Sequence, residues 1–207
     1  MHTLVFDIDG TLIESMAIDS DLYFGAIEQV LGPVRFRDLN EYEHVTDDGI
    51  LSQVFDDNGI AQSAEITKSI KQLFVAGIRA HIDDDGGFPG IDGARRFFNT
   101  ARESNCFKVA VATGGWRESA CLKLQSADLD IAGVPMATSD DARSRVEIMQ
   151  LALAKAGGEV DSVTYFGDAD WDRRACSQLG WRFIPVGPHV DGITSYAEID
   201  LNAIAAA

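Results

Sequence analysis

Short apolar runs rich in β-branched residues alternate along this chain with segments whose apolar residues recur at helical spacing. The runs predict strands near residues 3–7, 107–112, 163–167 and 182–186, with a weaker strand near 132–136. The segments between them predict helices near residues 91–104, 117–126, 142–156 and 172–179. This alternation is typical of a parallel sheet covered by helices on both faces. We therefore expect an α/β, Rossmann-like fold.

Residues 14–84 interrupt this alternation, because their apolar residues follow helical spacing with no strand pattern between them. We predict a core domain of residues 1–13 and 85–207 and a small helical domain, residues 14–84, inserted after the first strand. Its linkers are expected near residues 12–17 and 82–88. The second linker contains Asp83-Asp84-Asp85-Gly86-Gly87, a polar stretch suited to a hinge.

Two aspartates, Asp7 and Asp9, follow the first predicted strand and precede a Gly-Thr turn. Side chains two residues apart in a strand point to the same side, so the two carboxylates are expected to lie close together. Nearby carboxylates repel unless one binds a proton or a cation holds them. Mg²⁺ suits such a site, because it is bound by one or two carboxylates and substrate phosphate oxygens. Taken alone, the motif is also compatible with a turn that carries no chemistry.

Residues 6–12 (F-D-I-D-G-T-L) resemble the first motif of the haloacid dehalogenase (HAD) superfamily of hydrolases. Three later segments resemble its other motifs in the same order. They are the strand that ends in Thr113-Gly114, the basic stretch of residues 139–147, and the G-D-x-x-x-D of residues 167–172. The resemblance covers nearly the whole chain. It implies that the helical insert is a cap domain, which can close over the site and contact the leaving group.

The resemblance also implies roles for individual residues. Asp7 is expected to be the nucleophile that forms an aspartyl-phosphate, and Asp9 the group that protonates the leaving oxygen. Mg²⁺ is expected between Asp7, the Asp9 backbone carbonyl and Asp168, with Asp172 as an outer ligand. Thr113 and the backbone N–H of Gly114 are expected to bind the phosphate. Without the resemblance, Thr113-Gly114 is equally compatible with an ordinary strand-to-helix turn.

The third motif usually contributes a lysine, whereas this chain offers Arg143 and Arg145. Arginine binds phosphate as a planar fork and does not simply replace lysine. We favour Arg145 and expect Arg143 to be solvated. In the fourth motif, we expect Asp170 to face solvent and Trp171 to pack rather than to contact substrate.

The specificity of the site is expected to rest on the cap. Residues 42–49 form a candidate polar loop between cap helices, and His44, Thr46 and Asp47 within it are candidate substrate contacts. Glu14, just beyond the first motif, is another. A solvent-exposed loop without a binding role is an equally good interpretation of this segment.

Asp9 favours phosphoryl transfer over dehalogenation, because an alkoxide leaving group needs a proton and a halide does not. The sequence therefore predicts a Mg²⁺-dependent phosphatase acting on a small phosphorylated metabolite. One alternative is a phosphomutase similar to β-phosphoglucomutase. The other is a non-catalytic protein that binds a phosphometabolite, although such a protein does not need both a nucleophile and a proton donor.

Composition excludes several other classes. With 17 Lys and Arg against 33 Asp and Glu, the net charge is −16, and no basic stripe suits nucleic acid. The three cysteines form no C-x-x-C pair, so free thiols are expected, and the four histidines lack zinc-ligand spacing. No signal peptide or long apolar run is visible. We expect a cytoplasmic protein, monomeric or homodimeric, with no nucleic-acid or membrane partner.

Overall fold

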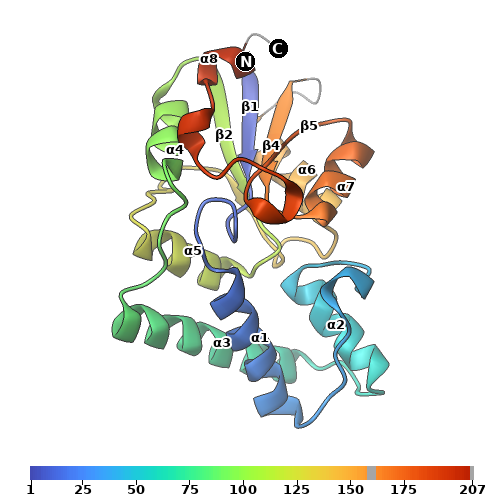
Figure 1. Cartoon of the computed structure of the whole chain (residues 1–207). Coiled ribbons are helices and arrows are strands. Elements are labelled where there is room, and N and C mark those ends of the chain that lie inside the picture. The colour runs from blue at the N-terminus through green and yellow to red at the C-terminus, as the bar shows by residue number, and fades with distance from the viewer. Residues whose placement is uncertain (158–161, 206–207) are drawn as a thin grey trace.

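The computed structural model describes residues 1–157 and 162–205. They include a five-stranded sheet with strand order β3-β2-β1-β4-β5 (Figure 1). The strands are β1 His2–Phe6, β2 Phe107–Ala112, β3 Met136–Ala137, β4 Val163–Gly167 and β5 Arg182–Pro185. Every pairing is parallel, and β1 lies between β2 and β4. A central strand is covered on both faces, and β1 is accordingly buried from Thr3 to Phe6. The predicted α/β, Rossmann-like sheet is confirmed.

The predicted strand near 132–136 is displaced toward the C-terminus and is only two residues long. Only two register pairs hold it to β2, Val111 with Met136 and Ala112 with Ala137. The preceding residues form a turn instead, in which the Val134 N–H donates to the Ile131 carbonyl. These residues therefore cannot enter the ladder.

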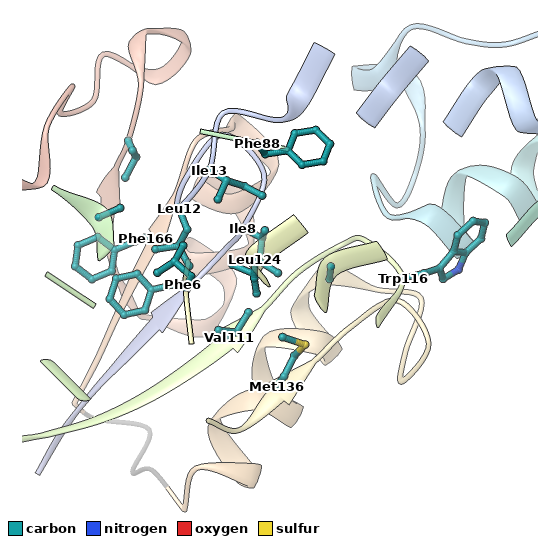
Figure 2. Close-up of a cluster of buried hydrophobic side chains, with 14 of the residues drawn as sticks. Phe6, Ile8, Leu12, Ile13, Phe88, Val111, Trp116, Leu124, Met136 and Phe166 are labelled. Atoms are coloured by element: carbon teal, nitrogen blue, oxygen red, sulfur yellow. The ribbon is translucent and has the colours of Figure 1, made fainter. Parts of the chain in front are cut away.

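Helices cover both faces of the sheet, as predicted. On one face, Phe6 and Phe166 belong to a cluster with Leu124 of α5 (Arg117–Ser126) (Figure 2), which also includes Phe98 of α4 (Ala94–Glu103). The C-terminal segments η3 (Tyr196–Glu198) and α8 (Leu201–Ala205) complete this layer. On the other face, Val5 and other apolar residues pack against α6 (Arg145–Lys155) and α7 (Asp170–Leu179).

Two helices begin later than predicted. The α4 helix begins at Ala94, after Gly93, rather than near residue 91. The α6 helix begins at Arg145, and Asp141 is not its cap. Asp141 instead accepts a hydrogen bond from the Thr138 N–H and binds Lys155. This carboxylate therefore organises the turn before α6.

The insert contains only helices, and all of its residues are described. They are α1 (Met16–Leu31), the short η1 (Leu39–Glu41), α2 (Asp47–Asp57) and α3 (Ala64–Asp85). In Figure 1 these helices lie beyond the carboxyl ends of β1, β2 and β4, and α3 packs against both α1 and α5. The insert thus faces the edge of the sheet where parallel sheets place their sites.

The sequence predicts a hinge at residues 83–87. This prediction is wrong for Asp83, Asp84 and Asp85, because α3 continues through Asp85. His81 Nδ1 lies 2.8 Å from Asp85 Oδ2, one turn further on, so the two side chains contact each other in the last turns of the helix. It ends at Gly86, which adopts a left-handed φ of 85° and donates its N–H to the Ile82 carbonyl. Only Gly86 and Gly87 of this stretch lie outside the helix.

Among the described residues, no helix combines the length and the apolar character that a membrane crossing requires.

Candidate active site

Three strand ends and one helix end meet at a single cavity. Asp7 follows β1, Thr113 follows β2, Asp168 follows β4, and Arg145 is the first residue of α6. The insert completes the cavity with residues of α1 and α2, including Tyr23. Strand order explains this convergence, because β1 lies between β2 and β4 and all three strands end at the same edge.

Three buried carboxylates lie close together at the cavity, and two of them, Asp7 and Asp168, line it. Asp7, Asp168 and Asp172 each offer an oxygen within 4.8 Å of the others. Burial raises the pKa of Asp7 well above its usual range, although Arg145 opposes the shift. Burial, followed by the charge of Asp172, raises the pKa of Asp168 to about 7. Burial likewise raises the pKa of Asp172.

This carboxylate group fits a divalent cation. One oxygen of Asp7 (Oδ1) and one of Asp172 (Oδ2) are buried without a hydrogen-bond partner. Leaving charged oxygens buried and unpaired is costly unless a proton or a cation compensates them. Oxygen donors of this kind suit Mg²⁺. The side chain of Asp9 is not in the group, because it is bound elsewhere.

Arg145 is the cation that contacts this group. Its Nη1 lies 3.4 Å from Asp7 Oδ2 and 3.1 Å from Asp172 Oδ1, and its Nη2 donates to the Val45 carbonyl at 3.1 Å. Burial would lower the pKa of Arg145, but the two aspartates outweigh it and raise the pKa. The buried Nε and Nη1 have no hydrogen-bond partner. Nε can therefore bind a ligand oxygen, whereas Nη1 already lies against the two aspartates.

Arg143 lies outside the site. Its Nε contacts Asp48 Oδ2 at 3.0 Å, and both side chains are partly exposed to solvent. Of the two candidate arginines, the structure brings only Arg145 to Asp7. The phosphate-binding role of Arg145 stays a prediction.

The Thr113 turn lies directly beside Arg145. Thr113 is buried, and its Oγ1 accepts the Gly115 N–H at 3.1 Å. A Cβ atom at Gly114 would lie 2.6 Å from Arg145 Nη2 and 3.0 Å from the Val45 carbonyl oxygen. Only glycine leaves room for the arginine at this position.

Asp9 is held by a buried lysine that the sequence analysis missed. Lys123 of α5 is fully buried, and its Nζ lies 2.5 Å from Asp9 Oδ1 and also binds Asp19 of α1. The Ser15 hydroxyl donates to the same Asp9 oxygen. The only sequence signal is that Lys123 falls on the buried stripe of α5 with Ala120.

The charges around Lys123 are strongly coupled. Burial raises the pKa of Asp19 to about 6, with Lys123 opposing the shift. Burial alone would lower the pKa of Lys123, but Asp19 and Asp9 raise it. The ammonium therefore stays charged and is shared by two carboxylates.

β1 ends at Phe6, so strand alternation does not reach Asp9. Asp9 is positioned instead by Lys123 and by a turn at Gly10. The φ of Gly10 is 73°, and a Cβ atom there would collide with the carboxylate of Asp168. Both aspartates of the first motif line the cavity. Their proximity is therefore a property of the turn rather than of the strand.

The candidate specificity residues divide into two pairs. Thr46 and Asp47 line the cavity, at the start of α2. Glu14 is exposed and does not line the cavity, because its backbone N–H is tied to the Pro89 carbonyl. The His44 ring lies beside Glu43, also outside the cavity. The structure does not bring Glu14 and His44 into the site.

The fourth motif differs from expectation at one residue. Asp170 faces solvent and contacts Arg173 of its own helix, as expected. Trp171 was expected to pack, but it is half-buried and lines the cavity. Trp171 is thus in a position to contact a ligand.

The family model for haloacid dehalogenase-like hydrolases matches residues 1–180. No curated protein matches the sequence. Among solved structures, a hydrolase from Pseudomonas syringae is 21% identical, with 89% of this chain and 84% of that chain covered and a TM-score of 0.71.

Two other solved structures are similar over nearly the whole chain. CbbY from Rhodobacter sphaeroides, in complex with xylulose-(1,5)-bisphosphate, is 18% identical, with 99% of each chain covered and a TM-score of 0.72. β-Phosphoglucomutase from Clostridium difficile is 12% identical, with 99% of this chain and 95% of that chain covered and a TM-score of 0.70. At these identities the likeness shows the fold alone.

Replacing Gly10 with alanine is expected to destabilise the protein more than the same change at Gly133. Both glycines have a φ near +74°, but a Cβ atom at Gly133 meets open space, whereas one at Gly10 meets Asp168. Backbone strain alone costs about 1–2 kcal/mol. Urea unfolding of both variants measures the difference. Equal losses would show that the close approach of Asp168 does not constrain residue 10.

The Lys123→Met substitution is expected to lower the free energy of unfolding by about 3–5 kcal/mol, because it leaves two carboxylates buried without a cation. The loss of unfolding free energy should be greater above neutral pH than in mild acid. In mild acid Asp19 becomes protonated, and one unpaired negative charge is removed. The control is Arg79→Met, which breaks the exposed pair with Glu118. It should cost at most about 1 kcal/mol in the same urea titration. Similar losses in both variants would contradict a structural role for the buried ammonium.

Proposed function

Because the chain belongs to the haloacid dehalogenase-like hydrolases, we propose that it is a Mg²⁺-dependent phosphatase that hydrolyses a small-molecule phosphate monoester. One observation supports this proposal above all others. The buried carboxylate of Asp7, which has an unpaired oxygen, lines the same cavity as Arg145, whose Nε has no hydrogen-bond partner. Asp7 also belongs to the group of three carboxylates that suits a divalent cation. Nucleophile, phosphate binder and metal site are thus adjacent.

Asp7 and Asp168 would hold Mg²⁺ directly, together with the Asp9 backbone carbonyl, and Asp172 would act as an outer ligand. When bound, the ion supplies positive charge that offsets the repulsion between the carboxylates and a phosphate dianion. Asp172 also contacts Arg145, so it would orient the arginine as well.

In the first half-reaction, the Asp7 carboxylate attacks phosphorus. The bond from phosphorus to the ester oxygen breaks, and that oxygen takes a proton from Asp9. Oδ1 of Asp9 is occupied by Lys123 and Ser15, whereas its Oδ2 lies toward Gly115 at the cavity wall. Oδ2 is therefore the oxygen that would carry the proton. Arg145 and Thr113 would bind the phosphoryl oxygens.

In the second half-reaction, water attacks the phosphorus of the aspartyl-phosphate. Asp9 takes back a proton from this water, the bond from Asp7 to phosphorus breaks, and inorganic phosphate leaves. Lys123 fixes the position of Asp9 throughout, so the same carboxyl can act first as an acid and then as a base.

We further propose that residues 14–84 form a cap domain on a core of residues 1–13 and 85–207. Tyr23 of α1 and Asp47 of α2 line the same cavity as Asp7, so the insert covers the site from the side opposite the sheet. Trp116, which follows β2 and the Thr113 turn, packs against Tyr23 and Phe74 of the insert and stands apart from the other labelled core side chains in Figure 2. The leaving group would therefore contact the insert.

Wild-type protein is expected to release phosphate from a panel of phosphate monoesters only when Mg²⁺ is present. The Asp7→Asn substitution should lower this turnover by at least about 10³-fold, because it removes the nucleophile. Asp170→Asn, which alters an exposed carboxylate of the fourth motif, is the matched control and should retain activity. Equal turnover by Asp7→Asn and wild type would rule out Asp7 as the nucleophile. Phosphate transfer between sugar phosphates without release would favour a mutase.

Mg²⁺ is expected to raise the melting temperature of the wild type, because a ligand that binds only the folded state stabilises it. Asp168→Asn should abolish this shift, since it removes a direct ligand, and Asp170→Asn should preserve it. Thermal melts with increasing Mg²⁺ test the metal site independently of catalysis. The same shift in all three proteins would place the bound ion elsewhere.

A further inference from the structure

One side of the cavity is lined by the insert rather than by the reacting groups, and we call this side the acidic end. Asp19, Tyr23, Leu39, Asp47 and Ile50 are among its residues. On the proposed function, the phosphoryl group lies at Asp7, so this end receives the leaving group. The character of this wall therefore bears on which esters can bind.

Asp47 is a nearly buried carboxylate in a fixed position. Its side chain accepts a hydrogen bond from the backbone N–H of Trp116 at 2.7 Å. Its own backbone N–H donates to the Gly114 carbonyl at 2.8 Å. The Tyr23 hydroxyl donates to its backbone carbonyl. These three contacts come from both the core and the insert, so Asp47 cannot easily turn away from the cavity.

No cation among the described residues is paired with Asp47. Lys123 is shared by Asp9 and Asp19, and Arg145 is bound to Asp7 and Asp172. Burial raises the pKa of Asp47 well above its usual range, and the charge of Asp19 adds to this shift. A buried carboxylate without a cation is costly, and a cationic ligand relieves that cost.

Unpaired polar atoms of Asp7 and Arg145 indicate independently that the cavity binds a ligand. The buried Oδ1 of Asp7 and the Nε of Arg145 have no hydrogen-bond partner within the described protein. These unpaired atoms would be satisfied by a bound phosphate ester and its metal ion. The acidic wall then acts on the remainder of that same ligand.

We propose that the leaving group of the substrate carries a positive charge, as in the phosphate ester of an amino alcohol, and that its ammonium lies against Asp47 and Asp19. This proposal rests on the proposed phosphatase function and specifies its substrate class. The aromatic rings of Tyr23 and Phe24 line the same end and also favour a cation. Conversely, a carboxylate or a second phosphate on the leaving group would face like charge there.

Three esters of similar size separate charge from shape. They are phosphoethanolamine, the neutral 2-hydroxyethyl phosphate, and phosphoglycolate, whose leaving groups are cationic, neutral and anionic. We expect kcat/KM of the wild type with Mg²⁺ to fall in that order, by at least about tenfold from first to last. The buried carboxylate of Asp47 would attract the cationic leaving group and repel the anionic one. The opposite order, or no order, would overturn the proposal.

The Asp47→Asn variant tests the residue itself. Asparagine keeps an acceptor for the Trp116 N–H but removes the charge, so the ratio of kcat/KM for phosphoethanolamine to that for phosphoglycolate should fall at least about tenfold. Asp48→Asn is the matched control, since Asp48 is partly exposed and paired with Arg143. Its ratio should equal that of the wild type. An unchanged ratio in Asp47→Asn would overturn the proposal while leaving the phosphatase function intact.

Failure of the phosphatase function is distinguishable from failure of the substrate class. If no ester, including p-nitrophenyl phosphate, releases phosphate, the proposed function fails. Calorimetry of the Asp7→Asn variant with Mg²⁺ and the same three esters then decides the charge proposal by affinity. Tighter binding of phosphoethanolamine than of phosphoglycolate would support it, and the reverse would overturn it.

Discussion

The burial of several carboxylates in one place is the constraint on which the rest of this structure depends. Asp7, Asp168 and Asp172 are brought together because two parallel strands and one helix end at the same edge. Within residues 1–157 and 162–205, Arg145 is the one cation in contact with this group, and a single guanidinium cannot compensate three carboxylates. The fold is thus built to receive further positive charge, and Mg²⁺ suits the oxygen donors present.

A second buried cation, Lys123, joins the insert to the core. Asp9 belongs to the loop after β1 and Asp19 belongs to α1, so one ammonium fixes both segments. The aromatic contact between Trp116 and Tyr23 reinforces the same junction. Separating the insert from the core would therefore expose both an ion pair and an apolar contact. This coupling ties the position of the proposed proton donor to the position of the insert.

The parts of the structure that follow from local pattern were predictable. The central strand is buried from Thr3 to Phe6 because it is covered on both faces, and residues 14–84 are helical as their spacing indicated. Long-range contacts were not predictable. The sequence favours Arg145 over Arg143, but only the structure shows that Arg145 contacts Asp7 and Asp172 while Arg143 pairs with Asp48. Lys123 resembles any helical lysine until Asp19 is placed beside it. The aspartates of residues 83–85 are exposed, yet they continue α3 without a break, which composition alone cannot reveal.

Charge connects the two ends of the cavity and the molecule as a whole. A net charge of −16 opposes the approach of any phosphate ester, so binding depends on local compensation. On the proposed function, Arg145 and a divalent cation would supply this compensation at the end of the cavity where Asp7 lies. At the acidic end the cavity is lined by the carboxylate of Asp47, and no cation among the described residues is paired with it. On the proposal above, the ligand would supply the compensating positive charge. An ester of an amino alcohol carries less negative charge than one with a carboxylate and presents its cation where the protein lacks one. On the two proposals, the same electrostatic requirement would select a metal at one end of the cavity and a substrate class at the other.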